Sequence, residues 1–222
     1  MATVTISLTI AIETPLSVGA GGSSGTIADR SVLRDGWGRP IIPGSQVKGK
    51  ARHAAEAIAR ALGWRVAELG APPDPADPCA IQLIFGAPGR QRSPLRFADL
   101  ALVEPDAPPD LGIDASWRAR AGQIRPSVSI SRRRGVAEDQ HLLMQETVAA
   151  PAQFANPLAV AGELDREPQL ALLLAGLRLN TRWGGAKSRG LGWGGVTATA
   201  TWGGQEFDDE RLARALREWQ KA

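Results

Sequence analysis

The fold of this chain is decided near its N-terminus by residues 3–12, which read TVTISLTIAI. Large aliphatic residues occupy every second position from Val4 to Ile12, and the positions between them hold threonine, serine or alanine. Side chains of a β-strand point alternately to its two faces, so this pattern predicts a strand with one buried and one polar face. Because crossover connections in a sheet have one hand, we expect the core helices to cover the same face of the sheet.

Outward from this strand, the chain alternates between strand and helix patterns. A turn at 35–38 between the short apolar runs 31–33 and 41–42 predicts a hairpin. Ser45 is the expected N-cap of a helix whose apolar stripe ends before Gly63. The remaining patterns predict a short helix, two strands, a leucine-rich helix, a strand and an amphipathic terminal helix, at 77–85, 95–103, 154–160, 167–179, 194–202 and 209–219.

A polar insertion separates the strands predicted at 95–103 and 154–160. Its two weakly alternating arms, 124–130 and 142–148, are joined by the polar residues 131–140. Alternation on both sides of a polar centre is typical of a hairpin, and these arms contain few large apolar residues. We therefore expect a protruding hairpin that packs little of itself into the core.

The order strand, hairpin, helix, strands, helix, strand predicts an α+β fold. We expect a ferredoxin-like or RRM-like βαββαβ core with loop insertions. The whole chain, 1–222, is expected to form one domain, with the protruding hairpin at about 117–148 and a Pro/Asp-rich insertion at about 66–78. Tyrosine is absent and no predicted strand carries a pair of stacking aromatics, so any RNA is expected to bind through loops, arginines and helix ends.

The composition excludes several classes of protein. Hydrophobic residues make up 43% of the chain and charged residues 22%, as in ordinary globular proteins. No apolar run approaches the roughly 20 residues that cross a bilayer, so we expect a cytoplasmic protein without a membrane partner. The single cysteine, Cys79, excludes an intramolecular disulfide and a multi-cysteine zinc site, and the two histidines, His53 and His141, are too few for a histidine-rich metal site.

Basic residues are mostly arginine, with 22 Arg against 4 Lys. The planar guanidinium suits phosphate binding and base stacking better than the ammonium of lysine does. Three segments without any acidic residue contain 14 of the 26 basic residues, namely 36–55, 115–137 and 168–205. If these segments converge in space, they form a surface for a polyanion such as a nucleic acid.

The first candidate site is the segment 42–50, IPGSQVKGK, at the predicted start of a helix. A tight turn at a helix N-terminus directs backbone amides toward one point, and Lys48 and Arg52 follow one turn apart, which suits a phosphate. The segment also fits the first seven positions of a P-loop, but Ala51 stands where the magnesium-binding Ser or Thr is needed, which argues against ATP. An ordinary helix start with solvated lysines is the alternative.

The second candidate site is the segment 183–195, WGGAKSRGLGWGG. Its six glycines let the backbone approach a ligand closely, while Lys187 and Arg189 supply positive charge for phosphates. The alternative is a flexible connection between a helix and a strand. Trp183 and Trp193 at its ends favour an ordered loop.

Together, the segment 42–50, the distal loop with Lys-Ser-Arg-Gly at 187–190 and the arginine-rich hairpin resemble the RAMP superfamily of CRISPR proteins. The resemblance covers nearly the whole chain and is greatest to the backbone subunit of type III effector complexes. It implies a subunit that binds guide RNA along its phosphate backbone and cleaves complementary target RNA at regular intervals. The implied partners are guide RNA, target RNA, other effector subunits and further copies of the chain.

The resemblance also implies roles for individual residues. The hairpin corresponds to the family's thumb, which wedges into the duplex of guide and target. The residues expected to bind RNA lie in the first motif, at the thumb and in the second motif: Ser45, Lys48, Lys50, Arg52, Arg132, Arg133, Arg134, Gly185, Lys187, Ser188, Arg189 and Gly190.

Residues 28–35, ADRSVLRD, are similar to the family segment whose first aspartate is required for cleaving target RNA. The resemblance assigns that catalytic role to Asp29 and leaves Asp35 as a turn residue. One carboxylate does not supply both an acid and a base, so we expect the 2′-hydroxyl of the RNA to attack the adjacent phosphate. Asp29 would orient these groups or bind a divalent cation, expected to be magnesium. We expect Asp29 on a flexible Gly/Ser-flanked loop, with little contribution to folding.

Two other functions stay open. Taken alone, a loop aspartate is commonly a turn or cap residue, and the chain would then be a non-catalytic capping or scaffold subunit that binds RNA. RAMP relatives that process guide precursors often use a catalytic histidine, so His53 or His141 would make the chain a guide-processing endoribonuclease. Each histidine also fits a surface or packing role.

Overall fold

The alternating N-terminal stretch forms strand β1 (Ala2–Ile12) in a computed structural model of the chain, as predicted. The model describes all residues except 20–27, 69, 75, 77–78, 104–120 and 219–222. The aliphatic side chains of β1 are buried from Val4 to Ile12. Its hydroxyl-bearing side chains lie on the other face, where Thr5 and Thr201 form a hydrogen bond between their Oγ1 atoms, 2.7 Å apart.

Strand β1 is central to a seven-stranded sheet whose strand pairs are antiparallel. One neighbour is β7 (Ala152–Leu164) and the other is β8 (Gly194–Trp202). The strand order is β2-β4-β7-β1-β8-β9, and β3 also pairs with β7. The four short strands are β2 (Ile41–Ile42), β3 (Leu95–Phe97), β4 (Leu100–Val103) and β9 (Gln205–Glu206).

The single strand predicted at 95–103 is wrong, because the chain leaves the ladder between β3 and β4. Asp99 lies at this break, and its Oδ1 accepts a hydrogen bond from the backbone N–H of Gly44, 2.8 Å away. Its carbonyl accepts a second bond from the side-chain amide of Asn156. The break thus places the carboxylate of Asp99 at the start of the helix that begins at Gly44.

Helix α1 (Gly44–Ala61) begins two residues earlier than predicted, and its N-cap is Pro43, not Ser45. The carboxylate of Asp99 caps the helix instead, since it accepts a hydrogen bond from the first backbone N–H of the helix. Gly44 also lies so close to the carbonyl of Phe97 that a Cβ atom there would collide with it. At the other end the predicted Gly63 follows the helix, and the N–H of Trp64 donates to the carbonyl of Ala59.

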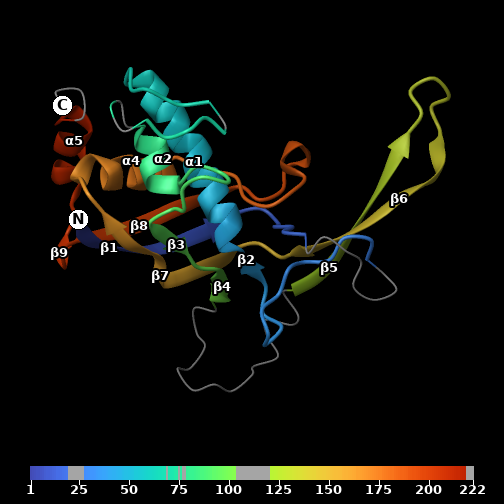
Figure 1. Cartoon of the computed structure of the whole chain (residues 1–222). Coiled ribbons are helices and arrows are strands. Elements are labelled where there is room, and N and C mark those ends of the chain that lie inside the picture. Colours follow the sequence, from blue (N-terminus) through green and yellow to red (C-terminus); the bar gives the residue numbers. More distant parts are fainter. Residues whose placement is uncertain (20–27, 69, 75, 77–78, 104–120, 219–222) are drawn as a thin grey trace.

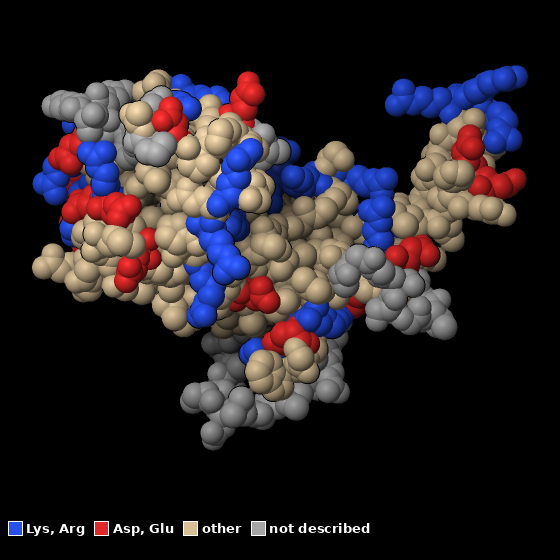
Figure 2. Space-filling model, in the orientation of Figure 1, with Lys and Arg blue, Asp and Glu red and all other residues tan. Residues whose placement is uncertain are grey.

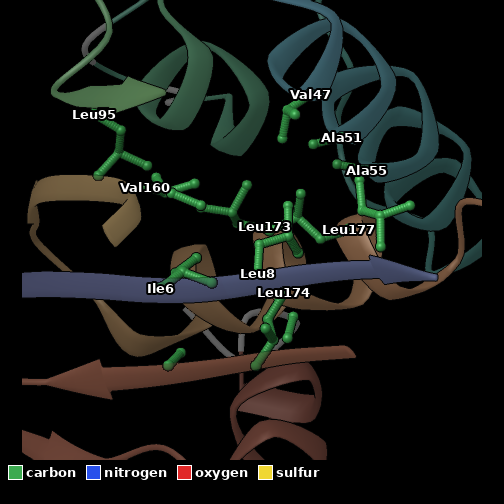
Figure 3. Packing of buried hydrophobic residues seen from close by; sticks show 14 of the residues in the cluster. Ile6, Leu8, Val47, Ala51, Ala55, Leu95, Val160, Leu173, Leu174 and Leu177 are labelled. Carbon is green, nitrogen blue, oxygen red and sulfur yellow. The ribbon is translucent and has the colours of Figure 1, made fainter. Parts of the chain in front are cut away.

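Three helices cover one face of the sheet (Figure 1). They are α1, α2 (Ala80–Phe85) and the leucine-rich α4 (Glu167–Arg178), whose leucines are all buried. Figure 3 shows Ile6 and Leu8 of β1 packed beneath the side chains of α1 and α4, with Leu173, Leu174 and Leu177 between the layers. Each buried leucine contributes about 1.5–3 kcal/mol relative to an exposed one. This apolar layer holds α1 in place.

Helix α5 (Asp209–Glu218) packs against α4, and Arg211 binds Glu167 of α4 at 2.6 Å. The described residues therefore form a mixed α/β structure with an antiparallel sheet and four α-helices. Among them, every helix is too short or too polar to cross a membrane. Three predictions reach beyond the described residues. These are the short helix at residues 77–78, the Pro/Asp-rich insertion in part of 66–78, and the terminal helix at Trp219.

The predicted hairpin is confirmed as a separate two-stranded sheet of β5 (Ala121–Ile130) and β6 (Ala137–Val148). It extends away from the end of the main sheet (Figure 1). The polar centre is shorter than the predicted 131–140, because β6 already begins at Ala137. Hydrogen bonds between Ser131 and Val136 and between Gly135 and Ser131 close a tight turn there. Residues 117–120 lie outside the description.

Candidate nucleic-acid interface

The two predicted motifs, 140 residues apart in sequence, lie side by side in the fold. The side-chain oxygen of Gln46 on α1 accepts a hydrogen bond from the backbone N–H of Gly184, 3.1 Å away. The same loop is fixed to the segment after β1, because Gly185 donates to the carbonyl of Ser17 and Gly192 donates to that of Pro15. These hydrogen bonds therefore hold the glycine-rich loop against the start of α1.

The two ends of this loop are joined at Trp183 and Trp193. The N–H of Trp183 donates to the carbonyl of Gly192 at 2.7 Å, and Arg182 forms a β-bridge with Trp193. Gly192 has φ +72°, and a Cβ atom there would collide with the carbonyl of Trp183, so only glycine fits. The guanidinium of Arg182 stacks on the ring of Trp193, with its carbon 3.8 Å from the ring centroid.

Lys50 of the first motif and Lys187 of the second lie close enough for their like charges to interact. The ammonium of Lys50 lies 5.4 Å from the ring centroid of the buried Trp183. Burial lowers the pKa of Lys50, and the positive charge of Lys187 lowers it further. Within the described part of the chain, neither ammonium forms an ion pair with a carboxylate. Two like charges held together in this way favour an anion between them.

The other two cations of this helix, Lys48 and Arg52, lie one turn apart as predicted and near enough for their charges to interact. Lys48 lies over the ring of Phe97 at 5.9 Å, and burial together with the charge of Arg52 lowers its pKa. Arg52 forms a 3.0 Å ion pair with Glu56. Residues two positions apart point to nearly opposite sides of a helix, so Lys48 and Lys50 diverge.

The helix N-terminus is also less open to an anion than predicted. The first amide, that of Gly44, is already bonded to the carboxylate of Asp99. Ser45 is exposed in the first turn. A phosphate at this end would therefore lie beside a negative charge, and the loop side of α1, at Lys50, is the more favourable place for it.

The exposed end of the second motif faces the hairpin. Lys187, Ser188 and Arg189 form a single 3-10 turn that Gly190 ends. A guanidinium nitrogen of Arg189 donates to the hydroxyl of Ser127 on β5, 3.3 Å away. An open cavity of about 250 Å³ lies here between loop and hairpin, lined in part by Ser129, Gln140, His141 and Leu142.

Asp29 lies at the base of the hairpin, and this corrects the expectation of a flexible, weakly held residue. The backbone N–H of Met144 on β6 donates to its Oδ2 at 2.7 Å. Its own N–H donates to the carbonyl of Met144, and Arg30 and Gln145 form a parallel β-bridge. Asp29 is still exposed to solvent.

Glu146 holds the same segment against the hairpin two residues further on. One carboxylate oxygen accepts the N–H of Val32 at 2.7 Å, and the other binds Arg34 at 2.5 Å. The segment from Asp29 to Arg34 therefore runs along the base of β6 as if it were a further strand.

A metal ion near Asp29 would depend on the RNA for most of its ligands. No group of three or more His, Cys, Asp or Glu side chains that could hold a metal is present among the described residues. One carboxylate suits magnesium, which keeps several waters and takes oxygens from substrate phosphates. Asp29 is thus a fitting single protein ligand.

The three arginines of the hairpin turn lie apart from the other candidate residues. Arg132, Arg133 and Arg134 are exposed in the hairpin turn, and Arg134 lies 3.7 Å from Glu138. Figure 2 shows this basic tip standing apart from the basic stripe on the body of the molecule. His53 is exposed on α1 and His141 on β6. Among the described residues, neither histidine forms an ion pair with a carboxylate.

Several contacts of this interface were missed by the sequence reasoning. Gln46 stands one helical turn before Lys50 on the same face of α1, and this spacing was the available signal. No local pattern connects Glu146 or Ser127 to residues more than 60 positions away in the sequence, so their contacts follow only from the fold. Asp35 behaves as predicted, since it accepts hydrogen bonds from within its own turn.

Comparison with models of protein families gives a match over most of the chain. A model of the RAMP superfamily matches residues 9–196, from β1 to the start of β8. The match includes the Asp29 segment, the start of α1, the hairpin and the glycine-rich loop. No curated protein matches the chain.

Proposed function

Because the chain belongs to the RAMP superfamily, whose model spans residues 9–196, we propose that it is a backbone subunit of a type III CRISPR effector complex. RAMP proteins are RNA-binding modules of CRISPR ribonucleoproteins. In the proposed role, copies of this chain line up along a guide RNA in the cytoplasm with other effector subunits. Each copy then cleaves complementary target RNA beside its thumb.

The proposal includes the fold of the subunit. We infer one RAMP domain over 1–222 with a ferredoxin-like core, in which the hairpin at about 117–148 is the thumb and 66–78 is a loop insertion. The strand order β4-β7-β1-β8 supports this, since α1 and α4 follow β1 and β7 on one face of the sheet.

Guide binding is supported by one observation above all, the juxtaposition of Lys50 and Lys187. Their ammonium groups repel each other in the free protein, and a phosphate between them relieves that repulsion. The Gln46–Gly184 bond fixes the distance between the two motifs. The other proposed RNA contacts are Ser45, Lys48, Arg52, Gly185, Ser188, Arg189 and Gly190, with Arg132, Arg133 and Arg134 on the thumb.

For cleavage, we propose that Asp29 orients the reacting groups of the target. The 2′-hydroxyl gives up its proton as its oxygen attacks the adjacent phosphorus, and the bond to the 5′-oxygen breaks. The leaving 5′-oxygen takes up a proton, so a 2′,3′-cyclic phosphate and a 5′-hydroxyl remain. Met144 donates to one carboxylate oxygen of Asp29, and in this scheme the other oxygen of the exposed side chain contacts the RNA or its cation. A bound magnesium ion would stabilise the charge that develops on the phosphate.

A second function is favoured by the same contact. An aspartate whose carboxylate accepts a backbone N–H has a structural role that needs no catalysis. The chain would then be a scaffold or capping subunit that binds guide RNA without cutting.

Purification of the native particle tests the proposal. We expect the chain to elute from gel filtration as a multimer that carries short RNA, and the particle to cut labelled target RNA at regular intervals. A multimer that binds target without cutting indicates the scaffold function. A monomer without RNA that cuts repeat RNA by itself contradicts both and indicates the guide-processing enzyme.

A further inference from the structure

Trp37 is exposed at the tip of a turn that is held unusually firmly. Its side chain is 70% exposed, although large aromatic side chains normally avoid such exposure. Asp35 organises the turn, because its Oδ1 accepts the N–H groups of Trp37 at 3.0 Å and of Arg39 at 2.8 Å. Burial raises the pKa of Asp35, but the hydrogen bonds and charge of Arg39 outweigh this and leave it below its ordinary value.

A cation is fixed beside the indole ring. The Nε of Arg39 donates to Oδ2 of Asp35 at 2.8 Å, so the arginine is held by the turn. Its guanidinium carbon lies 5.2 Å from the centroid of the Trp37 ring. An aromatic face and a positive charge are therefore preorganised together at an exposed point.

The turn is tied rigidly to the base of the hairpin by Arg34. One of its guanidinium nitrogens donates to the carbonyl of Gly38 in the turn at 3.1 Å, and the other binds Glu146 on β6. The position of Trp37 is thus fixed relative to the strand that also holds Asp29.

Charges of both signs surround this unit: the cations are Arg30, Arg34 and Arg39, and Arg34 is paired with Glu146 of β6. Between residues 28 and 55 the carboxylates are Asp29 and Asp35, and Asp35 is paired with Arg39. The exposed Arg30 lies between Asp29 and the turn in sequence. The exposed Arg30 is therefore the cation for a phosphate, while the guanidinium of Arg39, which Asp35 holds beside the indole, is a second planar group suited to stacking on a base.

We propose that Trp37, backed by Arg39, is a stacking platform for one unpaired base of single-stranded RNA. The inference rests on the proposed RNA-binding function. It adds a contact that does not depend on the RNA sequence, since every base has a flat face that can stack on an aromatic ring. The phosphate next to the stacked base lies within the field of Arg30 and Arg39.

The test uses the full chain and an unstructured single-stranded RNA that carries 2-aminopurine at successive positions. Trp37→Ala should lower the affinity at least about fivefold. The salt dependence should stay unchanged, because stacking releases no counterions. Trp37→Phe should keep most of the affinity, and 2-aminopurine quenching at one position should disappear in Trp37→Ala. Leu179→Ala, another exposed apolar residue, is the matched control and should bind like wild type.

Three outcomes overturn the inference or its premise. If Lys50→Ala weakens binding and Trp37→Ala does not, the platform is wrong and the RNA-binding function stands. If neither variant changes the affinity, the RNA-binding function itself fails. If Trp37→Ala abolishes self-association of the RNA-free protein at unchanged RNA affinity, Trp37 is a contact between proteins. Thermal unfolding of both Trp37 variants checks that the fold is intact.

Discussion

Asp29 and Met144 bind each other in both directions: the N–H of Met144 donates to the carboxylate of Asp29 at 2.7 Å, and the N–H of Asp29 donates to the carbonyl of Met144 at 2.9 Å. The candidate catalytic residue therefore belongs to the base of the hairpin. If the hairpin separates guide from target, this pair holds the carboxylate at the place where the target is deformed. Correct geometry at a reacting phosphodiester contributes strongly to rate.

Removal of the Asp29 charge should abolish cleavage without loss of the fold. Asp29→Asn keeps an oxygen that accepts from Met144, so we expect stability and target affinity near wild type. Target cleavage in the assembled complex with magnesium should fall by at least ~100-fold. Asp29→Ala should lose the same activity and also about 1 kcal/mol of stability from the missing hydrogen bond.

Asp35→Asn is the control for that experiment, because it keeps the acceptor for its turn and should cleave normally. Wild-type cleavage by Asp29→Asn would exclude a catalytic role and leave the scaffold function.

The two juxtaposed lysines should dominate guide binding. Lys50→Ala and Lys187→Ala should each weaken binding equally across guide sequences and lower the slope of log affinity against log salt by about 0.7. Arg52→Ala should have a smaller effect, because Arg52 is already paired with Glu56. Filter binding at several salt concentrations measures this, and an equal or larger effect of Arg52→Ala would contradict the assignment.

The lowered pKa of Lys50 gives a pH dependence with a definite sign. Lysine binds phosphate only when protonated, so affinity should fall as the pH rises through the lowered pKa, below the ordinary 10.5. Lys50→Arg should remove this early loss, because arginine keeps its charge. Titrations with 2′-O-methyl RNA, which resists alkali, check the result. Identical pH profiles for both proteins would refute it.

Glu146 should be important for the stability of the hairpin base. Glu146→Ala leaves the N–H of Val32 and the guanidinium of Arg34 without their acceptor, so the free energy of unfolding should fall by about 1–3 kcal/mol. Glu138→Ala, near the exposed tip, removes only a weak surface pair and should change stability by less than about 1 kcal/mol. Urea denaturation measures both variants, and equal losses would contradict this role.

The tip of the hairpin should be the first site of tryptic cleavage in the free protein. Arg132, Arg133 and Arg134 are exposed in the turn at the end of the hairpin, and such tips open easily. Assembly with guide and target RNA should protect them if the hairpin is a thumb. Cleavage there at equal rates with and without RNA would argue against RNA contact at this tip.

Local patterns predicted much of the secondary structure. The alternation in β1, the leucine-rich α4 and the glycine-rich loop are short-range signals, because periodicity directly reflects which face is buried. Boundaries that depend on distant partners were wrong, as at Ser45 and in the strand broken by Asp99. There a carboxylate from another part of the chain supplies the cap that Ser45 was expected to provide.

The sequence by itself determined the layers of the fold and the positions of the two candidate RNA-binding motifs and the hairpin, since each follows from local spacing and composition. Only the tertiary structure decided that Lys50 lies near Lys187 and that Asp29 is anchored to Met144. These relationships join residues more than 100 positions apart. Their geometry is set by packing of the helices on the sheet, which no pattern within a single segment contains.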